Sequence, residues 1–373
     1  MMEHYQSADI ADIAEKVRAG QRLSLDDGRR LYACPDPVAV GSLAHERRTA
    51  LHGDAAYYVV NRHVNYTDVC VNGCAFCAYY KEEGQAGASV LTPDDVVLRL
   101  TSSPLPPVEV HMVGGCHPSL PLTYFEDLLR AVRAALPHAA IKAFTAVEIA
   151  HFATVNALSV DEVLGRLMDA GLDMLPGGGA EIFHPEVRER ICPRKATADE
   201  WLDVHRRAHR LGLPTNCTML FGHIESTDHR LDHLDRLRRL QDESLAAGAA
   251  GFTCCIPLPF LTANNALAVE HPLTGLDELR TIALTRLMLD NIPHVKAYWV
   301  MLGVKQAQAA LYFGADDFDG TVVEERIGHS AGADSEQGLP RTEIEAMLGG
   351  CGCTPVERDA FFRHLQQSGE GRP

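Results

Sequence analysis

Short apolar runs alternate with amphipathic stretches along most of the chain. Each run is rich in β-branched residues, ends in a polar or glycine-containing loop, and is followed by apolar residues at helical spacing. Strand starts recur about every 30 to 45 residues, which is the length of one strand–helix unit. We expect these runs to be strands: residues 57–65, 108–113, 140–145, 172–175, 214–221, 251–256, 295–301 and the least regular one, 315–318.

Helix boundaries are marked between the runs. Two pairs match the capping box, in which each residue's side chain satisfies the other's free amide: Ser159 with Glu162, and Thr197 with Glu200. Further threonines stand three positions before an acidic residue and predict similar helix starts: Thr92, Thr123 and Thr274. Glycines stand where helices would end: Gly171, Gly212 and Gly248.

The N-terminal segment follows a different pattern. It reads as helical, since Ile10, Ile13, Ala14 and Val17 recur at helical spacing and Ser24 is typical of a second helix start. The later strand–helix units show no change in composition, and so many units close into one barrel better than they form two open sheets. We therefore expect an α/β fold, a (β/α)8-type TIM barrel. Its predicted parts are a helical extension over 1–54, the barrel over 55–362 and a polar tail over 363–373 that is frayed from residue 366.

In such a barrel the chemistry lies where the strands end. The segment after the first strand holds Cys70, Cys74 and Cys77 at C-x3-C-x2-C spacing. Three thiolates on one short loop can hold three irons of a 4Fe–4S cluster and leave the fourth iron open to another ligand. Zinc is an alternative, with His63 as a fourth ligand, although structural zinc favours paired C-x2-C spacing. Three buried free thiols are the remaining alternative.

Composition and charge limit the classes of molecule that the protein is expected to bind. The chain has 373 residues, 46% hydrophobic and 23% charged, which is ordinary for a globular protein. Its net charge of −16 would repel nucleic acid and anionic membranes, while a small anionic substrate needs only a local basic pocket. We see no signal peptide and no apolar run of about 18 residues that predicts a membrane span. With eleven cysteines and no export signal, we expect a cytoplasmic protein with free or metal-bound thiols.

The cysteine loop resembles the radical S-adenosylmethionine (radical SAM) superfamily, whose signature is C-x3-C-x-aromatic-C, with Phe76 at the aromatic position. The resemblance implies a 4Fe–4S cluster whose open iron is chelated by S-adenosylmethionine. The reduced cluster then cleaves S-adenosylmethionine to methionine and a 5′-deoxyadenosyl radical. An electron donor such as flavodoxin or ferredoxin is implied as a partner.

Further segments look like one branch of the superfamily, which contains aminofutalosine synthase, dehypoxanthine futalosine cyclase and the deazaflavin (FO) synthase subunits. They are residues 61–67, 114–118, 142–149, 175–182, 191–193 and 218–225. Residues 144–149 and His117-Pro118 look most like the aminofutalosine synthase family of the futalosine route to menaquinone. Cys116 stands where leucine is usual in this branch.

That resemblance implies a transferase that adds the adenosyl radical to the vinyl carbon of 3-[(1-carboxyvinyl)oxy]benzoate. Aryl migration and loss of CO2 or bicarbonate then give 6-amino-6-deoxyfutalosine, with S-adenosylmethionine consumed as a co-substrate. The cyclase and the FO synthase are alternatives within the branch. A zinc-stabilised binding barrel without catalysis is the alternative outside it.

Candidate cofactor-binding residues stand at the predicted strand ends. The resemblance places Gly114 and Gly115 near the methionine amino group, although a tight turn would use glycine equally well. Glu148 and Glu181 could accept hydrogen bonds from ribose hydroxyls or balance the cofactor's ammonium, with a helix N-terminal charge as the alternative. Residues 177–179, with Gly177 and Gly178 first, would pass close to the adenosyl group.

The proposed substrate is a small-molecule dicarboxylate and should meet cationic or amide donors. The candidates are Arg62, His63, Lys142, Arg194, Lys195 and Lys296. His63, His117 and His223 are candidate catalytic residues, as proton relays or substrate donors, and satisfied polar histidines are the alternative.

Other cysteines suggest no second cluster. Cys351 and Cys353 cannot ligate one alone, and Cys254-Cys255 lie inside a predicted strand. Three more read as small buried hydrophobes: Cys34, Cys192 and Cys217.

Overall fold

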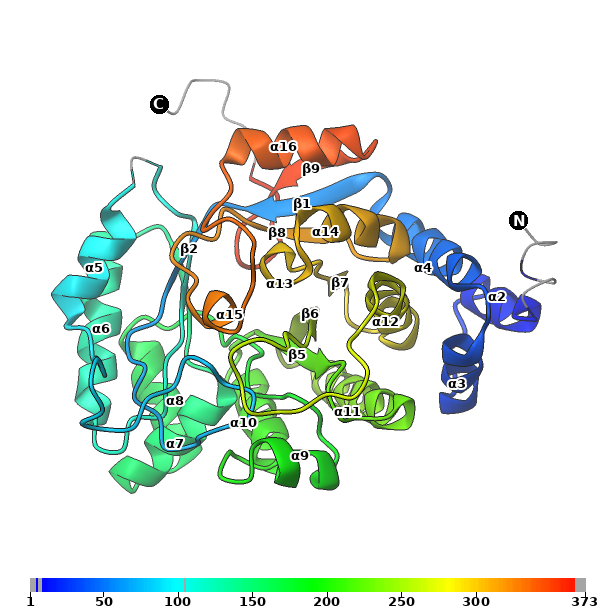
Figure 1. Ribbon diagram of the computed structural model, residues 1–373. Coiled ribbons are helices and arrows are strands. Elements are labelled where there is room, and N and C mark those ends of the chain that lie inside the picture. Colours follow the sequence, from blue (N-terminus) through cyan, green and yellow to red (C-terminus); the bar gives the residue numbers. More distant parts are fainter. Residues whose placement is uncertain (1–4, 6–8, 104, 366–373) are drawn as a thin grey trace.

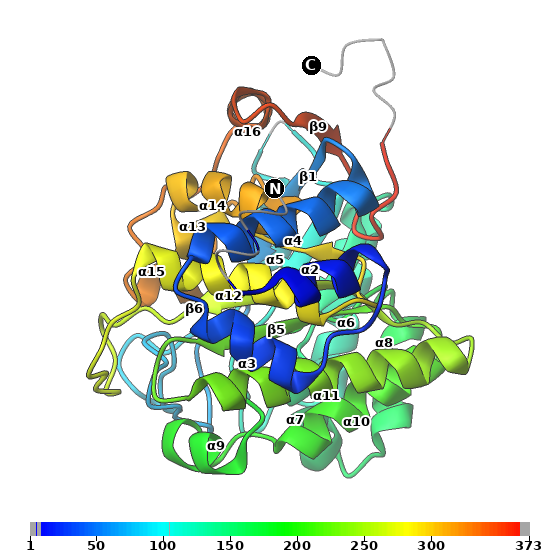
Figure 2. The same cartoon turned by 90° about the vertical axis from the view of Figure 1, so that its right-hand side faces the viewer.

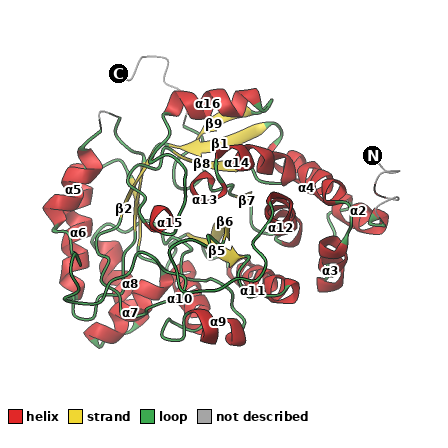
Figure 3. Ribbon diagram, viewed as in Figure 1, coloured by secondary structure: helices red, strands yellow, loops and turns green. Residues whose placement is uncertain are grey.

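The computed structural model describes residues 5, 9–103 and 105–365 (Figure 1). The frayed tail predicted from residue 366 lies outside the described residues. Strands surround a central axis and helices cover the outside of the ring (Figures 1 and 3). The strands are β1 (Ala55–Val59), β2 (Asn61–Val64), β3 (Glu109–Met112), β4 (Ala140–Ala143), β5 (Thr215–Phe221), β6 (Phe252–Pro259), β7 (His294–Val295), β8 (Asp317–Gly320) and β9 (Thr354–Glu357).

Parallel pairing runs around the ring. Ladders join β2–β3–β4, β5–β6–β7 and β8–β1. Isolated parallel bridges connect these groups: Lys142 with Met174, Leu175 with Thr215, Lys296 with Asp317, and Arg62 with Val323. Residues 174–175 therefore act as the strand between β4 and β5. The predicted α/β fold and (β/α)8-type barrel are confirmed, since every predicted strand position contributes to the ring.

Two strand details differ from the predictions. The run 295–301 forms only the short strand β7 and then turns into helix α13 (Trp299–Leu302). An apolar run of this length does not distinguish a buried strand from a buried helical turn. Strand β9 was not predicted, and it pairs in parallel with β1. It brings Arg358, which follows it, to the barrel interior, where the guanidinium pairs with Asp317.

The helices of the barrel alternate with the strands. They are α5 (Pro93–Thr101), α6 (Leu122–Ala135), α7 (Ala146–Asn156), α8 (Val160–Asp169), α9 (Pro185–Ile191), α10 (Ala198–Arg210), α11 (Thr227–Ala246), α12 (Gly275–Met288), α14 (Val304–Ala310), α15 (Ile327–Ser330) and α16 (Arg341–Gly350). The predicted capping boxes are present at Ser159, Thr197, Thr92 and Thr274. As predicted, a glycine with positive φ directly follows the C-cap residue of three helices: Gly171 after α8, Gly212 after α10 and Gly248 after α11.

The helix start predicted at Thr123 is wrong. Helix α6 begins at Leu122, and its first free amide is capped from a distance: Leu122 N–H donates to Asn156 Oδ1 at 2.9 Å. Asn156 ends helix α7, so this cap is supplied by the tertiary structure and leaves no local signal.

The predicted N-terminal helical extension consists of α2 (Ala11–Arg18), α3 (Leu25–Ala33) and α4 (Pro37–His52). Figure 2 shows these helices lying across α11 and α12 on one side of the barrel. The exact division of the chain at residues 54 and 362 stays a prediction. Within the described residues, no helix is long and apolar enough to cross a membrane.

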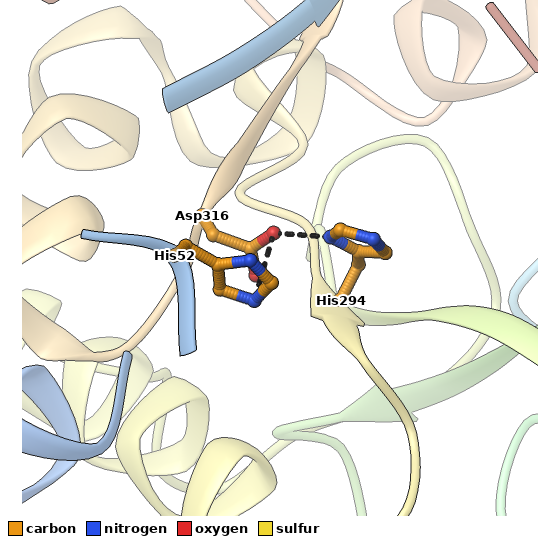
Figure 4. A group of neighbouring side chains, drawn as sticks. All are labelled: His52, His294 and Asp316. Atoms are coloured by element: carbon orange, nitrogen blue, oxygen red, sulfur yellow. Dashed lines mark hydrogen bonds and ion pairs between the residues drawn. The ribbon is translucent and has the colours of Figure 1, made fainter. Parts of the chain in front are cut away.

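The end of α4 is fixed to the barrel by a small polar cluster (Figure 4). Asp316 Oδ2 lies 2.6 Å from His294 Nδ1 and 3.6 Å from His52 Nε2. The other carboxylate oxygen of Asp316 pairs with the buried Arg286, and His52 Nε2 lies 2.9 Å from the Pro293 carbonyl. Each of these polar groups therefore has a partner within the protein, and the cluster joins the N-terminal helical extension to the barrel.

Candidate active site

A cavity of about 330 Å³ lies inside the ring, walled by the loops that follow the strands. This volume is typical of small-molecule sites. Most of the predicted site residues line it: Cys70, Cys74, Cys77, Phe76, Gly114, Gly115, Glu148, Gly177, Gly178, Glu181 and His63. The barrel therefore gathers into one place residues that are far apart in the sequence.

The cysteine loop is fixed by backbone hydrogen bonds. Cys70 N–H donates to Lys81 O at 3.0 Å, and Ala75 N–H donates to Ile191 O at 2.8 Å. Arg194, predicted as a substrate donor, instead donates from Nε to Asn72 O at 3.2 Å and so supports this loop. The three cysteines are thus presented on one wall of the cavity by neighbours from two other segments.

The three thiols are not gathered as closely as the ligands of a single zinc ion would be. Among the described residues, only two groups place three metal-ligand atoms within 4.8 Å of one another, and the three cysteines are in neither. Ligands of one zinc ion, each about 2.3 Å from the metal, would be gathered that closely. A 4Fe–4S cluster, in which each cysteine binds a separate iron atom, does not require its thiolates to be gathered that closely.

The thiols differ in their readiness to ionise. A hydrogen bond from the Cys116 thiol lowers the pKa of Cys70 to about 5, against the opposing effect of burial. Burial raises the pKa of Cys74 to about 12 and also raises that of Cys77. Cys116, which was not among the predicted site residues, is itself buried and accepts a hydrogen bond from Asn72 Nδ2 at 3.3 Å.

Gly115 brings two backbone segments into close approach. A Cβ atom on this residue would lie 2.2 Å from Val69 O and 2.9 Å from Cys70 Cβ. Its amide donates to Thr67 O at 2.9 Å. Only glycine therefore fits between the end of β3 and the cysteine loop, and the contact of Gly115 with the cofactor's methionine amino group stays a prediction.

Glu148 lies in the cavity wall with its acceptor positions occupied. One carboxylate oxygen accepts from the Tyr66 hydroxyl and from Gly114 N–H, and the other accepts from the amide and hydroxyl of Thr145. The last two bonds form the capping box of α7, the alternative that the sequence left open. Burial raises the pKa of Glu148 to about 7, although these hydrogen bonds oppose the shift. The contacts make Glu148 a positioning residue for Gly114.

Glu181 forms a buried ion pair with Lys195, whose Nζ lies 2.5 Å from Oε1. Lys195 also lies over the ring of Phe76, 5.2 Å from its centroid. Burial disfavours the charged amine, but Cys74 and Glu181 outweigh it and raise the pKa of Lys195. The Lys195 side chain therefore stays positively charged beside the cysteine loop, where it would stabilise thiolates or a carboxylate ligand.

Two predicted histidines lie outside the described cavity wall. His117 Nδ1 accepts from Ser119 N–H at 3.2 Å, and the His223 ring lies 3.0 Å from Glu225 Oε2. Both are satisfied within the protein, the alternative that the sequence left open. Arg62 is likewise engaged, since it donates to Arg99 O at 3.1 Å.

The three cysteines predicted to be buried hydrophobes are buried, and the other cysteines lie elsewhere in the fold. Cys34, Cys192 and Cys217 are buried in the core, and Cys254-Cys255 lie within β6. Cys351 accepts from Gln308 Nε2 at 3.4 Å, at the end of α16.

Comparison with known proteins identifies the family. Residues 64–237 match the radical SAM superfamily, and residues 249–367 match the CofH/MqnC C-terminal region. The chain is 46% identical to aminodeoxyfutalosine synthase of Thermus thermophilus, over 96% of each chain. The chain belongs to the radical SAM superfamily. Within it, the sequence groups with the aminodeoxyfutalosine synthases, as predicted.

One further relative supports this grouping, and a more distant relative has a different activity in its name. The chain is 42% identical to aminodeoxyfutalosine synthase of Streptomyces coelicolor, over 95% of this chain and 94% of that one. It is 36% identical to the 5-amino-6-(D-ribitylamino)uracil–L-tyrosine 4-hydroxyphenyl transferase of Methanopyrus kandleri, over 96% and 99%. Methylornithine synthase (PylB) shares the fold, with a TM-score of 0.70 at 17% identity over 92% of this chain and 97% of that one.

Proposed function

We propose that this radical SAM protein is a transferase that joins the adenosyl group of S-adenosylmethionine to 3-[(1-carboxyvinyl)oxy]benzoate and forms 6-amino-6-deoxyfutalosine for menaquinone biosynthesis. The observation that carries the proposal is the loop of Cys70, Cys74 and Cys77 on the wall of one cavity. The two aminodeoxyfutalosine synthases, similar over nearly their whole length, support the choice of substrate.

The three cysteines would hold a 4Fe–4S cluster, and Gly115 would keep Cys70 in place beside the end of β3. When bound, that cluster supplies the electron that cleaves S-adenosylmethionine, with flavodoxin or ferredoxin as the proposed donor. Lys195 and Glu181 offer one positive and one negative group beside the loop, suited to the carboxylate and the ammonium of a methionine moiety.

Apolar side chains form another part of the cavity wall. Leu220, Leu258 and Phe260 line it, and Leu220 and Phe260 are almost completely buried. Such a wall helps to exclude water from the part of the cavity where the radical would react. In the proposed reaction the vinyl carbon receives the adenosyl radical and the aryl group moves from oxygen to carbon. The carboxylate then leaves as CO2 or bicarbonate together with one electron, equivalent to the one that cleaved S-adenosylmethionine, so that the product is closed-shell.

The second candidate keeps the radical chemistry and changes the substrate. The similarity to the Methanopyrus kandleri transferase favours a reaction with L-tyrosine and 5-amino-6-(D-ribitylamino)uracil. A cyclase of the same branch would release free 5′-deoxyadenosine, because there the radical abstracts hydrogen.

An anaerobic reaction separates these candidates. Reconstituted protein is mixed with dithionite, S-adenosylmethionine and 3-[(1-carboxyvinyl)oxy]benzoate, and products are identified by mass spectrometry. The proposal requires an adenosyl–aryl adduct that has lost one CO2 equivalent. Free 5′-deoxyadenosine alone would keep the radical chemistry but reject this substrate. Turnover only in a parallel reaction with tyrosine and the uracil would reject it in favour of the other transferase.

A further inference from the structure

Three side chains from neighbouring strands form one layer inside the barrel. His63 of β2, His111 of β3 and Lys142 of β4 are direct partners in the parallel register. All three line the cavity. The imidazole rings of His63 and His111 are stacked, with centroids 4.5 Å apart and planes inclined by 13°.

Hydrogen bonding fixes the protonation of the first ring. Asn61 Oδ1 accepts from Val322 N–H at 2.9 Å, which orients the Asn61 amide. Its Nδ2 then lies 3.4 Å from His63 Nε2, so this ring nitrogen is the acceptor. This contact favours the neutral His63 ring with its proton on Nδ1, and burial likewise lowers the pKa of His63.

The second ring has no such partner. Neither nitrogen of His111 is hydrogen-bonded to any of the residues that the structure describes, and the ring borders the cavity. Burial, followed by His63 and Lys142, lowers the pKa of His111 well below its ordinary value. The layer thus holds two neutral imidazoles, and one of them, His111, has an unused nitrogen that can gain a proton.

The surrounding charges are already balanced. Lys142 Nζ lies 2.6 Å from Glu109 Oε1, and Lys296 Nζ lies 2.5 Å from Asp319 Oδ1. Arg358 pairs with Asp317 beneath them. An anion that enters this buried site would therefore add uncompensated charge, and histidine is the group best able to compensate near neutral pH.

We propose that the His63–His111–Lys142 layer binds one carboxylate of the aryl dicarboxylate substrate, and that binding transfers one proton from solvent to the imidazole pair. This inference rests on the proposed function and assigns one end of its substrate. Lys142 keeps spare N–H donors beside its bond to Glu109, and a protonated His111 would supply a charged donor next to it.

The groups facing His111 set the direction of the pH dependence. Lys142 and Lys296 oppose its protonation and Glu109 favours it. The stacked His63 ring is in turn disfavoured in its charged form by burial and Lys142 and favoured in it by Asp319, Glu325 and Glu109. A bound carboxylate adds negative charge at closest range and raises the proton affinity of the pair. Substrate affinity should accordingly fall as the pH rises above neutrality, as the proton becomes harder to acquire.

Isothermal titration calorimetry tests this directly. The reconstituted holoenzyme, without reductant, is titrated with 3-[(1-carboxyvinyl)oxy]benzoate in phosphate and in Tris, buffers with small and large heats of ionisation. We expect the binding heats in the two buffers to differ, and the difference divided by the difference in their heats of ionisation should correspond to the uptake of nearly one proton. The variants His111→Gln and His63→Gln should each lose this difference and bind roughly 10- to 100-fold more weakly, the effect of one or two charge-assisted contacts.

The matched control is His138→Gln, a change at an exposed histidine after α6 that should alter neither affinity nor heat. Thermal unfolding of each variant checks that it is folded. Equal heats in both buffers, or unchanged affinity in His111→Gln, would overturn the inference. If product forms but His111→Gln binds normally, this inference alone fails. If the compound binds with proton uptake but no adduct forms, the proposed function alone fails, and absence of both binding and product rejects both.

Discussion

The close approach at Gly115 predicts that Gly115→Ala releases iron without unfolding the barrel. The new Cβ would lie 2.2 Å from Val69 O and 2.9 Å from Cys70 Cβ. The first separation is more than 1 Å below the optimum of about 3.5 Å for such atoms. Because Gly115 N–H is bonded to Thr67 O, the Val69–Cys70 segment has to give way. Overpacking of this kind costs about 1 to 3 kcal/mol.

The same displacement would move Cys70 away from its partners. Metal–ligand distances tolerate only about 0.2 Å, so a shift of order 1 Å should prevent stable cluster assembly. Iron content and visible absorption after anaerobic reconstitution would measure this, and denaturant unfolding of the metal-free protein would measure the cost. We expect iron to fall from about four atoms per chain to below about one.

The control is Gly165→Ala, because this helical glycine in α8 has open space where a Cβ would stand. It should retain all its iron and gain up to about 1 kcal/mol in stability, since alanine favours a helix interior. If Gly115→Ala kept both full iron and wild-type stability, the steric reasoning would be refuted.

Three further predictions concern other contacts. Cys74→Ser should abolish iron binding and S-adenosylmethionine cleavage, whereas Cys353→Ser near the C-terminus should keep both, as iron analysis would show. Lys195→Met should destabilise the metal-free protein by about 3 to 5 kcal/mol because it leaves Glu181 buried and unpaired, and Lys195→Met/Glu181→Gln should recover part of that loss in denaturant titrations. A hydrogen bond to Glu325 raises the pKa of His329 from 6.5 to about 9, so its stabilising effect is complete below pH 6.5 and disappears as the pH rises through 9. The difference in unfolding free energy between wild type and His329→Gln should shrink over that interval; a constant difference would contradict the assignment.

Features encoded over a few neighbouring residues could be predicted from the sequence. The capping boxes at Ser159 and Thr197 depend on residues three positions apart, and they form as predicted. The Thr123 start failed because the helix is capped by Asn156, which is remote in sequence. Strand β7 ended early because its apolar run continues as a helical turn, a distinction that apolar pattern alone does not encode.

The candidate site likewise combines features that the sequence predicted with features that depend on the tertiary structure. Most predicted cofactor residues do border the cavity, because barrel strands all end at the same face and place their loops there. The sequence missed His111 and Cys116, and it suggested His117 and His223, which are engaged elsewhere. A histidine carries no local sign of whether its ring faces the barrel interior or a neighbouring loop.

By itself, the sequence determined the barrel, its helical extension and the three-cysteine loop, since these follow from local periodicity and spacing. Only the tertiary structure decided that His63, His111 and Lys142 share one layer and that Lys195 stands beside Glu181 and Phe76. It also decided that Glu148 has its acceptor positions filled. The physical reason is that side-chain partners across a parallel sheet depend on register between strands joined by long crossovers, and register is fixed by packing of the whole barrel.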